Sequence, residues 1–298
     1  MRPRRLASLA VLLALTTAPL GAQAWRTVHT SRAASGSTDS VAVRVHYSMG
    51  VLTLEAAAPG LLYDVRMRYD RNRGMALSRF DTATRTLVVE SDSVALGARL
   101  GLRGISMARE SGGRNDKKPG SATIALGRSA PLAVDLDVAA AEAKLDFSDL
   151  TLTGLSVRSA AADTRITFGT ANRVRIPELS IRGIATHVGV RQLGNANAER
   201  IDLRVIAGQL EVDVEGDWTG TMDLRVDVSL GQATLRVPSD VGVRLEWNSL
   251  LGDLTAPGFT AREGVHMSPN WDTATRKLTI EADARLGQLT LEWMTTAR

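Results

Sequence analysis

Hydrophobic and polar residues alternate with a period of two over much of the chain. The clearest runs are residues 41–45, 201–205, 222–230 and 241–247, where apolar residues fill every second position. This period puts apolar side chains on one face and polar ones on the other, as a half-buried strand requires. Glycine, asparagine, aspartate and proline separate the runs and supply turns. Residues 139–144 have local helical propensity, but their strand-like surroundings favour a loop or a distorted strand. The pattern predicts an all-β protein.

A glycine–glutamine pair recurs at the start of three strand-like runs. Gly208, Gly231 and Gly287 are each followed by glutamine and then by apolar alternation, at spacings of 23 and 56 residues. Corners of this kind at irregular spacing indicate coils of a β-solenoid with loops of variable length. Glycine permits the corner backbone, and the next apolar residues re-enter the stack. A β-sandwich whose hairpins share turn chemistry is the alternative.

Two pentapeptides are identical. The sequence Asp-Thr-Ala-Thr-Arg occurs at residues 81–85 and 272–276, each time just before a strand-like run. An aspartate at the start of a turn accepts hydrogen bonds from backbone N–H groups about two residues further on. Each segment is therefore predicted to be a turn that leads the chain into a strand.

The N-terminus has the features of a targeting segment. Arg2, Arg4 and Arg5 precede an apolar run over residues 6–20, and the small-x-small sequence at 22–24 follows. This order predicts a secretory signal peptide over residues 1–24. The run is shorter than the roughly 20 residues that a membrane-spanning helix needs, although an uncleaved membrane anchor is the alternative. We expect an exported protein, periplasmic or extracellular, without an integral membrane span after cleavage.

Composition divides the remaining chain into four parts. Residues 25–40 are polar and small and predict a flexible linker. Residues 41–104 are expected to form a small N-terminal β domain, and residues 121–298 the solenoid domain. The polar loop between them, 105–120, contains the most polar segment of the chain at 109–120 and marks the predicted boundary.

Charge and cysteine content exclude several classes of partner and site. The chain has 36 Lys+Arg and 32 Asp+Glu, a formal charge of +4. Cleavage after residue 24 removes three arginines and no acid, which lowers this charge to +1. A nearly neutral surface gives no electrostatic case for binding nucleic acid. The absence of cysteine excludes disulfides and cysteine-ligated zinc.

Three segments resemble a known family. Residues 43–54 read Val-Arg-Val-His-Tyr-Ser-Met-Gly-Val-Leu-Thr-Leu and continue into Gly-Leu-Leu-Tyr-Asp at 60–64. They look like the N-terminal domain of bacterial toast-rack proteins. Residues 145–168 and the tail at 286–291 resemble the stacked-strand toast-rack domain, which also occurs in LiaF-like proteins of the cell-wall-antibiotic response. The resemblance covers nearly all of the chain after residue 24, and its motifs are structural.

The resemblance implies a right-handed, β-helix-like stack of strands with an envelope or cell-surface role in adhesion, scaffolding or stress sensing. It supplies no catalytic residues. LiaF-like regulators carry several membrane helices ahead of this domain, whereas this chain shows only a signal peptide. That departure weakens the case for direct control of a membrane kinase.

Residues with catalytic potential do not form a recognisable motif. The four histidines, His29, His46, His187 and His266, are not spaced as a metal pair. Asp135 with Asp137, and Asp213 with Glu215, each share a strand face at a separation compatible with glycosidase acids. The solvated face of a strand explains these pairs better, as it explains the histidines. Nucleotide-binding and serine-nucleophile motifs are absent. We therefore predict no catalytic residue, cofactor or metal site.

Aromatic side chains give one hint of ligand binding. The predicted solenoid domain contains Trp218, Trp247, Trp271 and Trp293. Aromatic rings can stack on sugars, but packing at strand ends is the more common role.

These features favour a non-catalytic, adhesin-like scaffold that presents loops on a rigid β stack. Its partner would be an envelope protein or a cell-wall polymer, and the polar loop at 109–120 is the first candidate for contact. The alternatives are an envelope-stress regulatory protein and a glycan-active β-helix enzyme.

Overall fold

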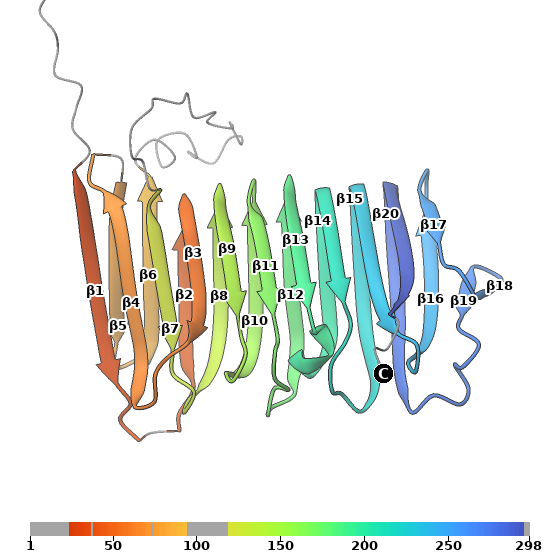
Figure 1. The fold of residues 1–298 in the computed structure, drawn as a ribbon, viewed down its shortest axis with the longest axis horizontal. Helices are drawn as coiled ribbons and strands as arrows, with labels where there is room; N and C mark the ends of the chain where they lie inside the picture. Colours follow the sequence, from red (N-terminus) through yellow and green to blue (C-terminus); the bar gives the residue numbers. More distant parts are fainter. Residues whose placement is uncertain (1–23, 37, 73, 94–118, 295–298) are drawn as a thin grey trace, which may run out of the picture.

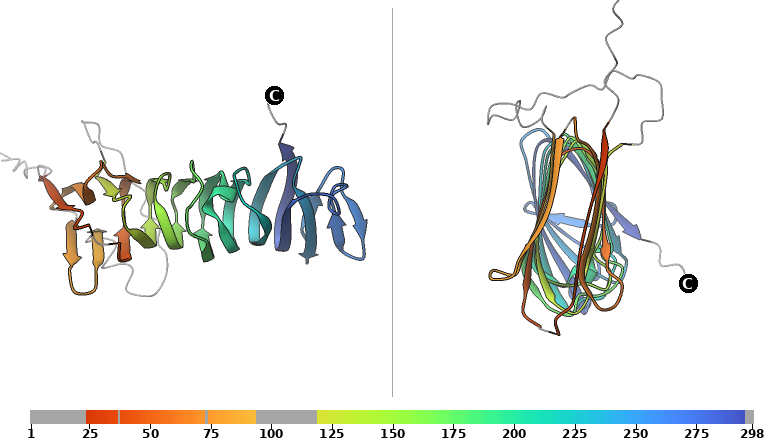
Figure 2. Two further views of the ribbon diagram at one scale, coloured as in Figure 1. Left: turned by 90° about the horizontal axis from the view of Figure 1, so that it is seen from below. Right: turned by 90° about the vertical axis from the view of Figure 1, so that its left-hand side faces the viewer.

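The fold is an elongated stack of β-strands with a flattened cross-section (Figures 1 and 2). The computed structural model describes residues 24–36, 38–72, 74–93 and 119–294. These residues contain no α-helix and one 3-10 turn, η1 (Leu193–Ala196). None of their helical segments is long and apolar enough to cross a membrane. The all-β, solenoid-like fold predicted from the sequence is confirmed.

The strands form one continuous sheet that folds into two walls. The first wall contains, in spatial order, β5 (Gly74–Asp81), β6 (Thr86–Ser93), β2 (Val41–Tyr47), β8 (Pro131–Ala139), β10 (Thr151–Ala160) and β12 (Ile176–Ile184). It continues through the first halves of β14 (Ala198–Asp213), β15 (Gly220–Pro238) and β20 (Arg276–Met294). It ends with β16 (Gly242–Ser249), β19 (Val265–Met267) and β18 (Thr260–Arg262).

The second wall lies opposite the first. It contains β1 (Trp25–Ala33), β4 (Leu61–Asp70), β7 (Ser121–Leu126), β3 (Gly50–Ala56), β9 (Ala141–Asp146), β11 (Asp163–Thr167) and β13 (Thr186–Arg191). The second halves of β14, β15 and β20 follow, and β17 (Asp253–Thr255) ends it. Strands in the middle of both walls run parallel, which distinguishes this stack from the alternative sandwich of antiparallel sheets.

One corner, here called the shared corner, joins the two walls. In the earlier layers it is formed by alanines with left-handed backbone, such as Ala161 at φ 50°. In the later layers the left-handed residue lies one position further on, at Gly208 (φ 131°), which is in register with Thr186 just after Ala185. Gly231 (φ 129°) and Gly287 are in register with Gly208. The predicted glycine corners are thus confirmed. Ala140 turns the chain between β8 and β9, so residues 139–144 form strands and not a helix.

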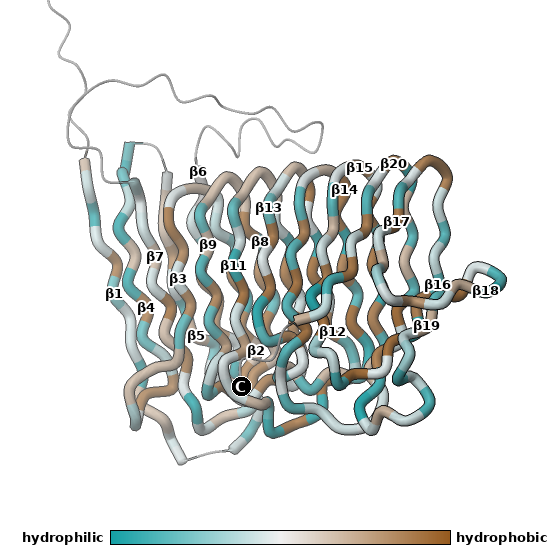
Figure 3. Tube along the Cα trace, turned by 45° about the vertical axis from the view of Figure 1, so that its right-hand side comes forward, coloured by the Kyte–Doolittle hydropathy of each residue, from teal (hydrophilic) through white to brown (hydrophobic). Residues whose placement is uncertain are grey.

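The core lies between the walls and repeats from layer to layer. Brown and teal segments alternate along the strands in Figure 3, as the period of two requires. One inward row crosses the first wall at Val43, Val134, Leu155, Leu179, Ile201, Leu224, Ile280 and Leu245. Each burial of such an aliphatic side chain contributes about 1.5–3 kcal/mol relative to exposure.

Chain order and spatial order differ at both ends of the stack. After β15 the chain builds β16 to β19 at the far end and then returns, so that β20 lies between β15 and β16. This excursion explains the long interval between Gly231 and Gly287. At the other end β2 lies between β6 and β8, and β3 lies between β7 and β9.

Two predicted parts of the chain differ from the structure. Residues 25–33 of the predicted linker form β1, which pairs along its whole length with β4, because a neighbouring strand edge satisfies backbone groups whatever the side-chain polarity. Strands of the predicted N-terminal domain share the walls and the hydrophobic core with the rest. The boundary predicted at 105–120 therefore separates neither two sheets nor two cores. Residues 1–23 of the predicted signal peptide and 105–118 of the polar loop lie outside the described residues.

The two identical pentapeptides both form turns. Asp81 accepts hydrogen bonds from the N–H groups of Ala83 (2.8 Å) and Thr84 (3.3 Å), as predicted, and β6 follows. These bonds hold the pKa of Asp81 below its ordinary value. In the second turn the N–H groups of Thr273 and Ala274 donate to the Asn270 carbonyl instead, and β20 follows.

Candidate functional site

The outer face of the second wall carries an open hollow of about 360 Å³. We call it the Gly189 hollow, after the residue at its centre. It is lined by His187 and by charged side chains from five neighbouring strands: Lys144, Asp146, Arg165, Arg191, Glu211, Asp213 and Arg236.

The hollow exists because one outward position lacks a side chain. Lys144, Arg165, Gly189 and Glu211 are in register across β9, β11, β13 and β14 and face outward. A Cβ atom built on Gly189 would meet no other atom within 4 Å. A glycine at an outward position therefore leaves a gap between a guanidinium and a carboxylate, in an otherwise continuous row of side chains.

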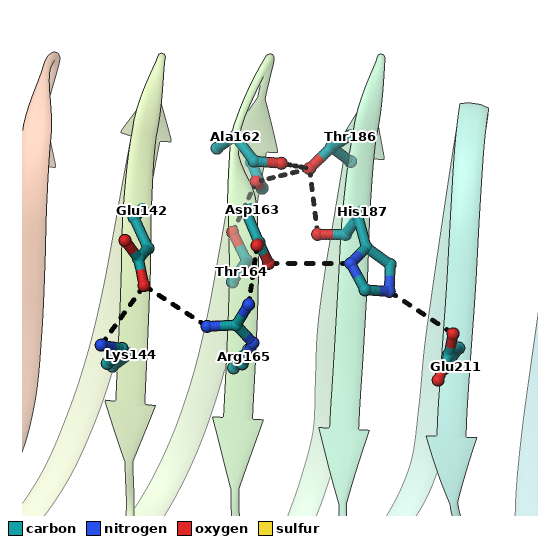
Figure 4. Close-up of polar contacts among 10 residues, drawn as sticks. Glu142, Lys144, Ala162, Asp163, Thr164, Arg165, Thr186, His187 and Glu211 are labelled. Atoms are coloured by element: carbon teal, nitrogen blue, oxygen red, sulfur yellow. Dashed lines mark hydrogen bonds and ion pairs between the residues drawn. The ribbon is translucent and has the colours of Figure 1, made fainter.

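One edge of the hollow is a chain of ion pairs (Figure 4). Glu142 lies 3.2 Å from the Lys144 amine and 3.4 Å from the Arg165 guanidinium. Arg165 also donates a 2.8 Å hydrogen bond to Asp163. The hydrogen bond from Lys144, and then its charge, hold the pKa of Glu142 below its ordinary value. Glu142 is therefore ionised near neutral pH.

His187 stands between two acids. Its Nδ1 lies 3.7 Å from Asp163 Oδ1, and its Nε2 lies 3.7 Å from Glu211 Oε1 (Figure 4). Both distances exceed the ordinary length of a hydrogen bond. Asp163 Oδ1 and His187 Nε2 are buried atoms with no hydrogen-bond partner in the part of the chain that the structure describes.

Arg236 forms the opposite edge of the hollow. Its guanidinium lies 3.2 Å from Asp213, 3.6 Å from Glu211 and 3.2 Å from Glu292. The hydrogen bond that Arg236 donates to Asp213 is the main cause that raises the pKa of Arg236. One guanidinium thus holds three carboxylates from two strands, β14 and β20, so the edge is ordered before any ligand binds.

A buried hydroxyl cluster holds the strands that carry His187 and Asp163. Ser159 Oγ lies 2.8 Å from the Thr164 hydroxyl and 3.2 Å from the Thr186 hydroxyl. Thr186 also donates to the Ala162 carbonyl (Figure 4). Because these hydroxyls satisfy one another beneath the shared corner, they fix where β11 and β13 begin.

The hollow combines cations, carboxylates and an imidazole, with hydroxyl-bearing residues nearby. These groups stand on neighbouring strands, which lie about 4.8 Å apart. Such an array can bind ions and donate or accept hydrogen bonds along an extended polar ligand. Among the described residues, His, Asp and Glu form no group of three or more arranged to hold a metal ion.

The acids considered from the sequence lie on outer faces and mostly pair with cations. Asp135 lies 3.0 Å from Arg158, and Asp137 lies 3.6 Å from His46 Nδ1. Asp213 is the one that the structure places in the Gly189 hollow. Glu215 is exposed beyond the end of β14.

The histidines and tryptophans are dispersed. His29 is hydrogen-bonded to Asp64, and His266 lies in β19. Of the four histidines, only His187 lines the hollow. Trp218 is buried, and the Trp293 ring stacks on Phe259 near one end of the stack.

Sequence reasoning did not find the hollow. The only local signal is Gly189 itself, at an outward position inside the alternating run Thr-His-Val-Gly-Val-Arg. The acids and arginines around it come from other strands, and only the register brings them together.

No family model and no curated protein matches the sequence. The solved structures that this chain is similar to include a candidate cell adhesion protein from Clostridium sporogenes, at 12% identity and TM-score 0.46, over 91% of this chain and 100% of that one. A candidate adhesin from Bacteroides fragilis matches at 10% identity and TM-score 0.38, over 91% and 98%. Another from Parabacteroides merdae matches at 8% and 0.31, over 91% and 96%. These likenesses are too distant to assign a function, and membership of the toast-rack family stays a prediction.

Proposed function

We propose that this chain is an exported, non-catalytic envelope protein that binds an extended cell-wall polymer on the outer face of its second wall. The observation that carries the proposal is the Gly189 hollow. It is an open recess bordered by fixed charges of both signs, on a wall backed by one continuous core.

Three features of this face suit a polymer. The recess is open rather than enclosed, so a long chain can pass through it. Ion pairs on both edges hold their side chains in place, which lowers the entropy lost on binding. The exposed Arg165 guanidinium and Glu211 carboxylate on either side of Gly189 offer hydrogen-bond donors and acceptors to hydroxyl or amide groups.

The test is co-sedimentation of the purified protein with insoluble cell-wall polymer. Gly189→Gln fills the recess at a position where added atoms meet nothing, so the fold should persist while binding weakens about tenfold or more. Gly154→Gln, in β10 of the first wall, is the matched control because its Cβ would also meet nothing within 4 Å.

Two results would overturn the proposal. One is equal binding by the Gly189→Gln variant and the unaltered protein. The other is cleavage of the polymer by the purified protein, which would favour the glycan-active alternative. Circular dichroism of both variants checks that any loss of binding is not a loss of fold.

A further inference from the structure

Exposed aliphatic side chains follow the shared corner along the length of the stack. They come from β12, β14, β15, β20 and the bend between β16 and β17, and are between 38% and 78% exposed: Ile184, Ile206, Leu230, Leu286, Leu250 and Leu251. We call this row the apolar strip. Scattered exposed aliphatics are ordinary, but a contiguous row marks an interaction surface.

A bipolar row of charges runs beside the strip on the first wall. Arg158, Arg182 and Arg204 are in register on β10, β12 and β14, and Asp227 and Asp283 continue the row on β15 and β20. On β8 the position beside Arg158 holds Asp137, beyond the positive end of this row, and Asp283 also pairs with Arg225 at 3.2 Å. Among the five residues of the row, positive charge fills one half and negative charge the other half. The change of sign falls between β14 and β15.

The shape of the surface divides at the same place. A hollow of about 300 Å³ lies over β10, β12 and β14, between the three arginines and the apolar strip, and Asp137 of β8 lines its end. The most exposed leucines lie in the other half, where Leu250 is 78% and Leu251 is 74% exposed. Their backbone N–H groups donate to carbonyls of Ala284 and Arg285, so these leucines are held beside β20.

We propose that the apolar strip and its bipolar row bind a second copy of this chain in an antiparallel, two-fold dimer. A two-fold axis across the strip, between β14 and β15, reverses the order of the strands in the second copy. Arg204 then faces Asp227 of the second copy, and Arg182 faces Asp283. The projecting leucines of each copy face the hollow of the other.

A surface that matches itself in this way fits a two-fold interface, in which the same patch serves both subunits. The three arginines already pair within their own wall, Arg204 with Asp227 at 3.2 Å, Arg182 with Asp202 at 3.4 Å and Arg158 with Asp135 at 3.0 Å. Each guanidinium has five N–H donors, and these side chains remain 41–52% exposed, so a second carboxylate can bind. The six strands of the proposed interface, from β10 to β16 in spatial order, span only about 24 Å. The interface is therefore small, and the dimer should dissociate on dilution.

The test is sedimentation of the protein, as its producing cell processes it, over a range of concentrations. The unaltered protein should shift from one to two copies as concentration rises. Arg204→Asp and Asp227→Arg should each weaken dimerisation about tenfold or more, because each places like charges opposite one another. An equal mixture of the two variants should restore the dimer, since each then meets the opposite charge. Mixing cannot repair a defect within one chain.

A cross-link gives an independent readout. The chain has no cysteine, so Ile206→Cys, next to the proposed axis, can form a disulfide only with its own position in another copy. Met75→Cys, 74% exposed on β5 at one end of the stack, is the control and should not cross-link. A protein that stays monomeric at every concentration, or variants that fail to recover on mixing, would overturn the dimer and leave the strip to a lipid or another protein.

Discussion

At the scale of single residues, glycines in this protein have two opposite roles. Gly231 is required by the backbone, with φ 129° and with the carbonyl of Gly208 where a Cβ would lie. The backbone of β13 does not require a glycine at position 189, and the missing side chain leaves the hollow. The first kind of glycine maintains the fold, whereas the second shapes a surface.

Replacing Gly231 by alanine should lower the free energy of unfolding by about 1–3 kcal/mol or more, since the left-handed backbone and the clash act together. Gly189→Ala should stay within about 1 kcal/mol of the unaltered protein, or stabilise it. Urea titrations followed by circular dichroism would compare the two. Equal unfolding midpoints for both variants would show that the corner does not need glycine.

At the scale of elements, the placement of β20 organises one end of the molecule. It is the last strand in the chain order, yet it pairs with β15 along one side and with β16 and β17 along the other. The strands β17 and β18 are short, and each has one paired neighbour among the described residues. A strand paired on both sides protects its amides better than one at an edge.

Hydrogen exchange followed by mass spectrometry should therefore find β20 among the slowest strands, together with β14 and β15. Peptides from β17 to β19 should exchange faster, although they precede β20 in the chain. The comparison is internal to one protein, so it needs no variant. If β20 exchanged as fast as β17, the inserted position of the last strand would be wrong.

At the scale of the whole molecule, carboxylates on both walls are held in the charged form by their partners. A hydrogen bond from His29 is the main cause that lowers the pKa of Asp64 below its ordinary value of 3.8, and one from His46 lowers the pKa of Asp137 in the same way. Lys144 lowers the pKa of Glu142 from 4.5. Folding therefore favours the ionised form at widely separated points of the stack.

The sign of the resulting pH dependence follows from linkage. A carboxyl with a lower pKa in the folded state stabilises the fold fully above its unfolded pKa and loses that contribution as the pH falls through the folded value. Stability should hold down to about pH 5 and decline from roughly pH 4.5 downward. Thermal unfolding between pH 6 and pH 2 measures this, and Asp137→Asn should reduce the slope. Stability that rises on acidification would contradict it.

Local pattern predicted most of the fold but little of the site. Alternation at 222–230 and the corner at Gly231 both appear in the structure, because side-chain period and backbone freedom are local properties. β1 was missed because its residues do not alternate and its stability comes from the edge of β4. The Gly189 hollow was missed because its charges lie on five strands.

The sequence by itself determined that this chain forms strands, that glycines turn them at a corner, and that their aliphatic faces point inward. Only the tertiary structure decided which strands are neighbours, including the return of β20 between β15 and β16. The physical reason is that the period of two fixes the face of each residue within its strand. The register between strands distant in sequence fixes which charges meet on the outer faces, and so produces both the hollow and the bipolar row.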